Sequence, residues 1–377
     1  MGNRSIEQEF KTVPFSFLDT RKKDWRFART RWLSKGIKSE LGRKKNLLSF
    51  SDSCIDVSSI FDPVLCEIMY TWFCPKNGKI LDPFAGGSVR GIVAGKLGFK
   101  YTGIELRKEQ VEENIKQAKP VIEKLIKEEV KEEYPKQYGV IKDKIGEEAK
   151  KKLSSEWLSE EEKKQEEYNF INKQTLAKKV VSEEKIEQEI RKATIYPTWF
   201  TGDAINVDKI VTEKQDFLFS CPPYYDLEVY SDLDGELSAM KTYDDFLEQY
   251  RSIIKKSVSK LNDNRFACFV VSRFRDKTDK AGRIIDFVGD TIKAFEEAGM
   301  IFYNDVILVN AIGSLPIRVQ TFFVKNRKIG GHHQNVLIFY KGDIAKIEPL
   351  AYHFSTGAEA VDERFDGKTY EVGDWEV

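Results

Sequence analysis

The amino-acid sequence predicts an α/β fold built around a mostly parallel sheet. Seven short apolar runs bounded by turn residues alternate with stretches of helical spacing, and a glycine-rich turn directly follows the first run. Strands that alternate with helices pair in parallel through crossover connections, so we expect a layered α/β domain. The last two runs flank a polar loop, which predicts an antiparallel strand at the sheet edge. The runs are 79–82, 100–105, 198–203, 216–221, 265–272, 304–310 and 335–342.

The composition changes sharply along the chain and suggests four parts. Within residues 1–50, thirteen Lys and Arg residues face five Asp and Glu residues, which makes a basic arm. The Lys/Glu-rich stretch 107–195 has sparse apolar residues and predicts exposed amphipathic helices, broken near Pro135 and Gly139. The parts are the arm at 1–50, the α/β domain at 51–106 and 196–345, the insertion at 107–195 and a C-terminal tail at 346–377.

Bulk composition excludes several classes of protein. Hydrophobic residues make up 41% of the chain, enough for a sizeable core. The five cysteines form no CxxC pair and the three histidines show no zinc spacing, so no metal site is expected, and His332 and His333 are expected to hold a loop. No apolar run approaches the roughly 20 residues that span a bilayer. Cysteines without disulfide spacing suit a reducing compartment, so we expect a cytoplasmic protein.

The stretch KILDPFAGGSVRGIVAGKLGFKYTGIE at 79–105 is the most informative. One strand ends at Asp82, Gly86 and Gly87 follow, and a second strand ends at Glu105. Ligands bind at the carboxyl ends of strands in such sheets, and glycines let backbone amides approach them closely. The stretch matches neither the G-x-G-x-x-G dinucleotide pattern nor the G-K-[ST] phosphate loop. Asp82, without a nearby lysine, favours a ligand with a positive or neutral head; S-adenosylmethionine fits, since it carries an ammonium and a sulfonium.

The second informative stretch is FLFSCPPYYD at 217–226. A buried strand stops on two prolines, which remove backbone donors and fix φ, so the chain leaves the sheet at a defined angle with its carbonyls exposed. Two tyrosines follow directly. This arrangement suits a site that accepts hydrogen bonds and stacks a flat group.

These motifs resemble those of a known family. DPFAGGS at 82–88, followed by the strand ending in GIE, resembles motifs I and II of the S-adenosylmethionine-dependent methyltransferases. SCPPYYD at 220–226 resembles motif IV of the DNA amino-methyltransferases, [DNS]-P-P-[YFW]. The sequence at 25–51 is similar to the leader of bacteriophage and prophage methyltransferases. The resemblance covers the arm and the core but not 107–195. It implies a Rossmann-like class I methyltransferase fold, a seven-stranded sheet, and the DNA methylation of restriction-modification systems.

The resemblance also implies a set of cofactor contacts. Asp82 would take the ammonium of S-adenosylmethionine, Glu105 would accept from both ribose hydroxyls, and Asp203 would accept from the adenine amine. The alternative interpretation of Asp203 is a helix cap after a strand. Phe61, with Asp62-Pro63, would lie near the methionine end. The complete set is Phe61, Asp82, Phe84, Ala85, Gly86, Gly87, Glu105 and Asp203.

The implied catalytic stretch is Cys221, Pro222, Pro223 and Tyr224. The amino group of adenine N6 or cytosine N4 is a poor nucleophile, because its lone pair is delocalised into the ring. Acceptors aimed at its N–H bonds, such as the Pro222 carbonyl, stabilise the positive charge that develops. Tyr224 would stack on the base, which leaves the duplex to reach the site.

Cys221 departs from the family pattern, which has Asp, Asn or Ser there. Sulfur is a weak acceptor, so Ser220, Asp226 or a water is an alternative acceptor. A cytosine-C5 enzyme would use a thiolate nucleophile, but in that family Pro precedes the Cys, whereas Ser220 stands here.

Substrate contacts are expected from Tyr225 and from two basic loops after strands, through Arg273 and Arg318. The expected partner is double-stranded DNA, with a homodimer as a further candidate. The insertion at 107–195 is expected to serve target recognition or oligomerisation. Three alternatives stay open: an RNA or protein amine methyltransferase, cytosine-C5 chemistry through Cys221, and a catalytically weak DNA-binding partner subunit.

Overall fold

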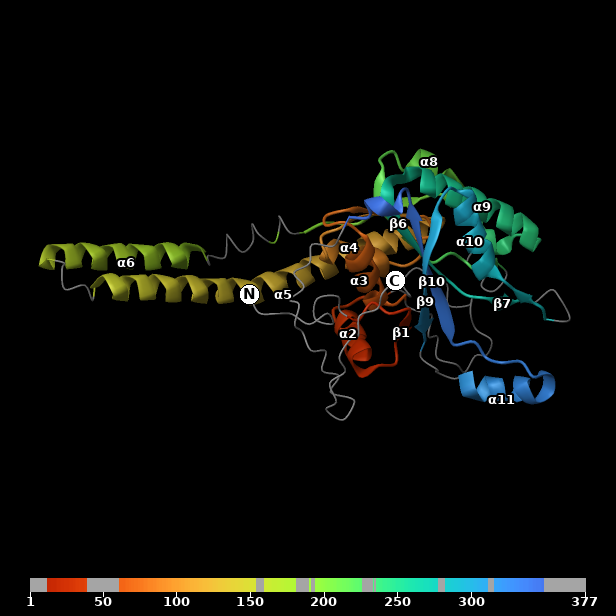
Figure 1. The fold of residues 1–377 in the computed structure, drawn as a ribbon, viewed down its shortest axis with the longest axis horizontal. Helices are drawn as coiled ribbons and strands as arrows, with labels where there is room; N and C mark the ends of the chain where they lie inside the picture. The colour runs from red at the N-terminus through yellow and green to blue at the C-terminus, as the bar shows by residue number, and fades with distance from the viewer. Residues whose placement is uncertain are drawn as a thin grey trace.

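The structure, a computed structural model, describes residues 12–38, 61–153, 159–180, 190, 194–225, 233, 235–276, 282–310 and 315–348. Within these residues an eight-stranded sheet has the order β1-β9-β10-β6-β5-β2-β3-β4 (Figure 1). The strands are β1 Phe17–Asp19, β2 Lys79–Asp82, β3 Lys100–Glu105, β4 Thr198–Thr201, β5 Gln215–Ser220, β6 Leu261–Val271, β9 Ile301–Val309 and β10 His333–Lys341.

The sheet confirms the predicted Rossmann-like α/β architecture. Apart from β1 and β10, the parallel strands lie in the doubly wound order 3-2-1-4-5-6, counted along the chain. The seven expected strands are all present, and the arm adds an eighth, β1, which pairs in parallel with β9.

The antiparallel strand lies in the interior of the sheet rather than at its edge. β10 pairs with both β9 and β6, because the chain returns from β9 into the space beside β6. β1 then covers the outer side of β9, with Phe17 opposite Ile307. The sequence places the last two strands side by side but gives no signal for a strand from the arm.

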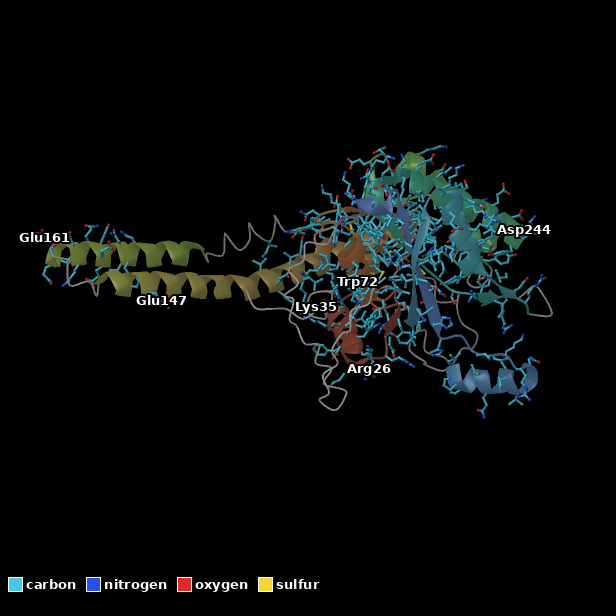
Figure 2. All side chains as sticks on the ribbon, viewed as in Figure 1. Arg26, Lys35, Trp72, Glu147, Glu161 and Asp244 are labelled. Atoms are coloured by element: carbon cyan, nitrogen blue, oxygen red, sulfur yellow. The ribbon has the colours of Figure 1, made fainter. Side chains whose placement is uncertain are left out.

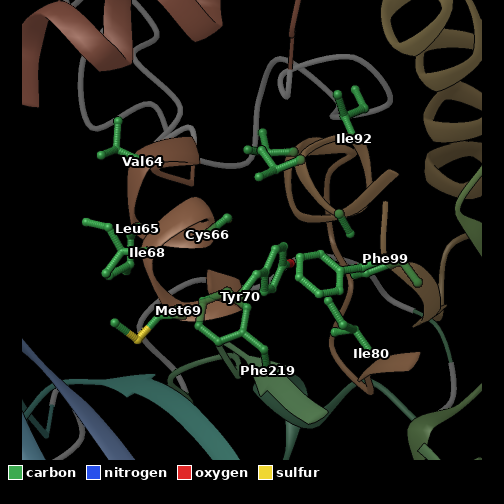
Figure 3. Close-up of a cluster of buried hydrophobic side chains, with 14 of the residues drawn as sticks. Val64, Leu65, Cys66, Ile68, Met69, Tyr70, Ile80, Ile92, Phe99 and Phe219 are labelled. Atoms are coloured by element: carbon green, nitrogen blue, oxygen red, sulfur yellow. The ribbon is translucent and has the colours of Figure 1, made fainter. Parts of the chain in front are cut away.

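Two apolar layers cover the two faces of the sheet. One face carries α3 (Pro63–Phe73) and α4 (Val89–Lys96), and Figure 3 shows Tyr70 of α3 beside Phe99 and Phe219. The other face carries α9 (Tyr243–Lys260) and α10 (Phe287–Glu297). The minor elements are η1 Ala204–Asn206, α8 Val207–Ile210, η3 Leu237–Ala239, the antiparallel pair β7 Phe274–Arg275 and β8 Ile284–Ile285, and η4 Ile344–Lys346.

The predicted insertion begins as part of the core. α5 (Lys108–Leu153) buries Val111, Ala118 and Ile122 against the sheet layer, so the packed core extends past the expected boundary at residue 106. Beyond this part, α5 and α6 (Glu160–Val180) run side by side away from the sheet (Figure 1). Figure 2 shows the exposed Glu147 and Glu161 far from the side chains that crowd around the sheet.

The expected helix break near Pro135 and Gly139 is wrong. α5 continues through both residues, and through Pro120 as well. A proline removes one backbone donor from a helix, and the helix continues here with the neighbouring α6 packed against it.

The described part of the arm is packed onto the domain. α2 (Lys23–Leu33) lies beside α3, where Trp25 Nε1 donates to Asp62 Oδ2 at 2.9 Å and Trp32 Nε1 donates to Glu67 Oε2 at 2.9 Å. Farther along, the backbone N–H of Lys38 donates to Gln117 Oε1 of α5 at 2.8 Å. The exposed residues of α2 include Lys23, Arg26 and Arg31. The arm therefore ties β9, α3 and α5 together and still presents basic side chains.

None of the helices in the described residues is both long enough and apolar enough to cross a membrane.

Candidate active site

The glycine-rich turn lies at the carboxyl end of β2. The strand order reverses at this strand, because β2 pairs with β3 on one side and with β5 on the other. Gly86 has φ +51°, a left-handed conformation that glycine adopts readily, and a Cβ placed on it would meet no heavy atom within 4 Å. Ala85 N donates to Ile104 O at 2.9 Å, which holds the turn against the neighbouring strand. The turn thus presents an open backbone face toward which a ligand can approach.

Glu105, at the end of β3, reaches back to this turn. Its Oε2 accepts from Gly86 N at 3.0 Å, and its Oε1 accepts from the backbone N–H and the Nε of Arg107, both at 3.1 Å. Asn114 Nδ2 of α5 donates to Gly86 O at 2.7 Å. A carboxylate oxygen has two lone pairs, so Oε2 can accept from a ligand hydroxyl as well as from Gly86 N.

Asp82 is enclosed by protein side chains, whereas the resemblance implies that it contacts the ligand. It is fully buried, and its Oδ2 accepts from Arg90 Nε at 2.5 Å and from Tyr101 OH at 2.7 Å. Its Oδ1 accepts from Ser220 Oγ at 2.6 Å. Both oxygens of the Asp82 carboxylate accept hydrogen bonds from protein donors, so the geometry disfavours the expected contact with a ligand ammonium. Asp82 positions the turn instead.

Arg90 of α4 completes this buried cluster. Its Nη2 donates to the carbonyls of Phe84 at 2.5 Å and Ala85 at 2.9 Å, and its guanidinium lies 4.6 Å from the Phe61 ring centroid. Burial alone would lower the pKa of Arg90, but the Asp82 carboxylate beside it raises that pKa, so the guanidinium stays charged. We call Asp82, Arg90, Tyr101 and Ser220 the buried cluster.

The Pro-Pro corner follows β5, the neighbour of β2 in the sheet. Ser220 ends β5 and is buried, and its hydrogen bond to Asp82 joins the corner to the glycine-rich turn. Cys221 and Tyr224 are half-buried, whereas Pro222 is buried. The two motifs therefore meet at the carboxyl ends of the neighbouring strands β2 and β5.

Tyr224 is held by contacts that leave its ring half-buried. Its OH accepts from Gln334 Nε2 of β10 at 3.0 Å. The ring packs edge-to-face against Phe274 and Phe287, with centroids 6.2 and 5.8 Å apart. An aromatic ring fixed in this way is suited to stacking a flat group.

Tyr225 is not placed for substrate contact. It is 3% exposed, its OH donates to Lys241 O at 3.1 Å, and its ring packs against Tyr243 and Phe246. Its φ of +28° marks a sharp turn in which the ring enters the core. The sequence pattern cannot tell which of two adjacent tyrosines faces inward.

Structural partners are found for three more residues expected at or near the cofactor, Asp203, Phe84 and Asp62. Asp203 caps η1 through Ile205 N at 2.9 Å, as the alternative interpretation expected. Phe84 stacks on Tyr250 at 6.1 Å, and Gly87 lies half-buried after Gly86. Asp62 caps α3, and burial raises its pKa.

The two arginines expected to contact the substrate lie in different structural elements. Arg273 is exposed and pairs with Asp286, Nε to Oδ1 at 2.7 Å. Such an exposed pair is weak, so the guanidinium can exchange partners at little cost. Arg318 belongs to α11 (Leu315–Asn326), so the second of the two expected basic loops contains a helix.

Sequence reasoning missed Arg90, Arg107 and Asn114. Arg90 is the single charge among the buried residues 89–95 of α4, and such an isolated charge in an apolar helix is the signal that points to a buried partner. Gln110 and Asn114 share the inward face of α5 at a spacing of four residues, and Gln110 Nε2 donates to Asn114 Oδ1 at 2.9 Å.

Within the residues that the structure describes, no cluster of His, Cys, Asp and Glu could hold a metal ion.

Comparison with known proteins gives distant structural likenesses. No family model and no curated protein matches the chain. TrmN from Thermus thermophilus is 10% identical at TM-score 0.35, over 74% of this chain and 49% of that protein. TTHA0409, also from Thermus thermophilus, is named a candidate DNA modification methylase and is complexed with S-adenosyl-L-methionine. It is 17% identical at TM-score 0.28, over 38% of this chain and 52% of that protein. The chain thus spans about half the length of each.

A third solved structure is magnesium protoporphyrin IX methyltransferase from Synechocystis PCC 6803 with bound SAM. It is 10% identical at TM-score 0.31, and the match covers 71% of each chain. Because these TM-scores are low, the assignment of the fold rests on the strand order and the connections of the sheet.

Proposed function

We propose that this protein is an S-adenosylmethionine-dependent DNA methyltransferase that modifies the exocyclic amine of adenine or cytosine. The observation that carries the proposal is the junction of the two motifs. Ser220, directly before the Cys-Pro-Pro-Tyr corner, donates to Asp82 at the start of the glycine-rich turn, 2.6 Å away. A turn suited to a nucleoside and a corner suited to a flat base therefore share one edge of the sheet.

The residues around the turn fit the proposed cofactor. Gly86 offers an open backbone face, and Glu105 places a carboxylate beside it for the ribose hydroxyls. The Oδ2 of Asp203, opposite the oxygen that caps η1, is the candidate acceptor for the adenine amine. When bound, S-adenosylmethionine supplies an electrophilic methyl group.

Replacing Glu105 with glutamine is expected to weaken binding of S-adenosylmethionine about tenfold or more. A hydrogen bond to a charged group contributes about 1.5–3 kcal/mol, and the neutral amide loses this charge as well as part of its grip on Gly86. Isothermal titration calorimetry measures the change. Glu213→Gln is the matched control, because Glu213 pairs with Lys79 at the opposite end of β2. Equal affinity in Glu105→Gln and wild type would contradict the assignment.

Alkylation tests whether the two motifs line the same site. Burial raises the pKa of the Cys66, Cys74 and Cys268 thiols, whereas Cys221 is half-buried at the corner. Among these four, we expect iodoacetamide to modify Cys221 first in the native protein, and saturating S-adenosylhomocysteine to slow that reaction. Peptide mass spectrometry follows each site. A rate at Cys221 that the nucleoside leaves unchanged would separate the corner from the cofactor site.

At the corner, backbone and side-chain acceptors act on the amine. The Pro222 carbonyl is the proposed acceptor, with Cys221 as the weaker one. Ser220 is less suited to this task, because its hydroxyl is buried and donates to Asp82. Asp226 lies outside the described residues. Tyr224 holds the base plane, and this fixes the amine for in-line attack.

Labelled methyl transfer tests the proposal. The protein is incubated with S-adenosylmethionine carrying a tritiated methyl group and with unmethylated genomic DNA, structured RNA or a protein mixture. We expect label in DNA. Label confined to RNA or protein would instead support the alternative amine methyltransferases. Tight cofactor binding without label in any substrate would support a partner subunit of low activity.

The hairpin formed by α5 and α6 is proposed to contact DNA or a second copy of the chain. It projects from the sheet, and Glu147 and Glu161 are among its exposed residues. Its mixture of Lys and Glu suits recognition or dimerisation better than a general phosphate clamp.

A further inference from the structure

α11 presents apolar side chains to solvent. Ile317 is 77% exposed, Val324 is 71% exposed, and Ile329 in the following turn is 79% exposed. Ile317 and Val324 are seven residues apart, so they lie on the same side of the helix. Figure 1 shows α11 apart from the sheet and from the helices that cover it.

The opposite face of α11 already has a partner. A Cβ placed on Gly330 would lie 2.3 Å from Val319 Cγ2 and 3.0 Å from Leu315 Cδ1, so the chain after the helix folds back over these two residues. The chain after the helix therefore covers Leu315 and Val319, which are half-buried, whereas Ile317 and Val324 are directed outward.

The charged side chains of the sequence around this helix are all positive. The sequence contains no Asp or Glu between Asp305 and Asp343, whereas Lys325, Arg327 and Lys328 follow the exposed face closely. The Arg327 guanidinium lies 5.3 Å from the Phe323 ring centroid. A cationic segment without carboxylates is complementary to a polyanion.

The residues that flank the α11 segment on both sides, Asn310 and Gln334, are hydrogen-bonded to the candidate active site. Asn310, after β9, donates through Nδ2 to Gln334 Oε1 at 3.3 Å, and Gln334 Nε2 donates to the Tyr224 hydroxyl at 3.0 Å. On its other side the segment meets the connection between β7 and β8, because Lys328 Nζ would lie 2.8 Å from a Cβ on Gly282. α11 is thus fixed to the same edge of the sheet as Tyr224.

We propose that α11 is a DNA wedge: Ile317 and Val324 enter the base stack of duplex DNA while Lys325 and Arg327 contact the flanking phosphates. This inference rests on the proposed DNA methyltransferase function and deepens it. Apolar side chains inserted at a base step partly unstack it, and a base that is to be methylated must leave its stack. The hydrogen bond from Gln334 to Tyr224 links the wedge to the ring proposed to receive the base.

Two variants separate the apolar and the ionic contributions. Ile317→Ser with Val324→Ser removes the wedge, and Lys325→Gln with Arg327→Gln removes two charges. The matched control is Ile344→Ser with Lys346→Gln in η4, an exposed pair at the other end of β10. Calorimetric binding of S-adenosylmethionine checks that each variant is folded.

Anisotropy measures binding to a mixed-sequence duplex at several salt concentrations, and duplex 2-aminopurine fluorescence measures unstacking. We expect the apolar variant to lose about tenfold in affinity and most of the fluorescence rise, with an unchanged salt slope. Since each phosphate contact contributes about 0.9 to the slope, the charge variant should reduce it by about 1.8. The control should match wild type.

The outcomes distinguish this inference from the function on which it rests. If wild type binds and methylates duplex DNA but the apolar variant binds and unstacks it equally well, the wedge is overturned and the methyltransferase proposal stands. If folded wild type binds S-adenosylmethionine but neither binds nor methylates duplex DNA, the proposed function fails and the wedge fails with it. Binding of structured RNA in preference to duplex DNA also overturns the DNA wedge.

Discussion

Replacing Arg90 with methionine should lower the free energy of unfolding by about 3–5 kcal/mol, because it leaves the buried Asp82 carboxylate without its cationic partner. It also removes the donors to the Phe84 and Ala85 carbonyls, so the glycine-rich turn loses its support. Urea unfolding followed by circular dichroism measures the change in stability.

Lys79→Met is the control, because Lys79 lies on β2, the strand that ends at Asp82. Lys79 pairs with the exposed Glu213, and such surface pairs contribute about 0–1 kcal/mol. If Arg90→Met and Lys79→Met lower stability equally, the buried cluster is not the element that fixes the turn.

Replacing Tyr224 with alanine should reduce kcat/KM for DNA by between about 5-fold and about 160-fold. Stacking of a base on an aromatic ring contributes about 1–3 kcal/mol, and a loss of 1.36 kcal/mol in transition-state stabilisation corresponds to a tenfold loss in rate. Steady-state methylation of DNA measures this, and binding of S-adenosylmethionine should stay within a few-fold of wild type.

Tyr224→Phe separates the ring from its hydroxyl. This variant keeps the stacking face and loses the hydrogen bond from Gln334, so it should retain most of the activity that the alanine variant loses. Equal kcat/KM in wild type and Tyr224→Ala would show that the base lies elsewhere.

The parts of the fold that were predictable are those with local sequence signals. The buried strands are short apolar runs in the sequence, and the turn at Gly86 directly follows one of them. The carboxyl ends of parallel strands lie at the same end of a sheet, which explains why the turn after Asp82 and the corner after Ser220 lie together.

The observed fold differs from the predicted one where contacts join residues that are far apart in the sequence. β1 joins β9 across nearly the whole chain, and nothing in residues 17–19 alone indicates that partner. α5 continues through Pro135 with α6 packed beside it, a contact that the local preference of proline does not indicate.

The site shows the same division. The spacing predicts the Glu105 carboxylate near the glycines, and Gly86 N donates to Glu105 Oε2 at the turn. The role of Asp82 depends on Arg90, Tyr101 and Ser220, three residues whose proximity emerges only from the folded sheet. Tyr224 and Tyr225 are identical in type, and the backbone turn alone sends one of them into the core.

The central claim is that the Pro-Pro corner directs methyl transfer to an exocyclic amine of a DNA base. Mass analysis of nucleosides from unmethylated DNA treated with the protein and deuterated-methyl S-adenosylmethionine tests it most directly. We expect deuterated N6-methyladenine or N4-methylcytosine, retained in Cys221→Ser because a hydroxyl also accepts a hydrogen bond. Deuterated C5-methylcytosine alone, abolished by Cys221→Ser, would contradict the claim and assign Cys221 as a nucleophile.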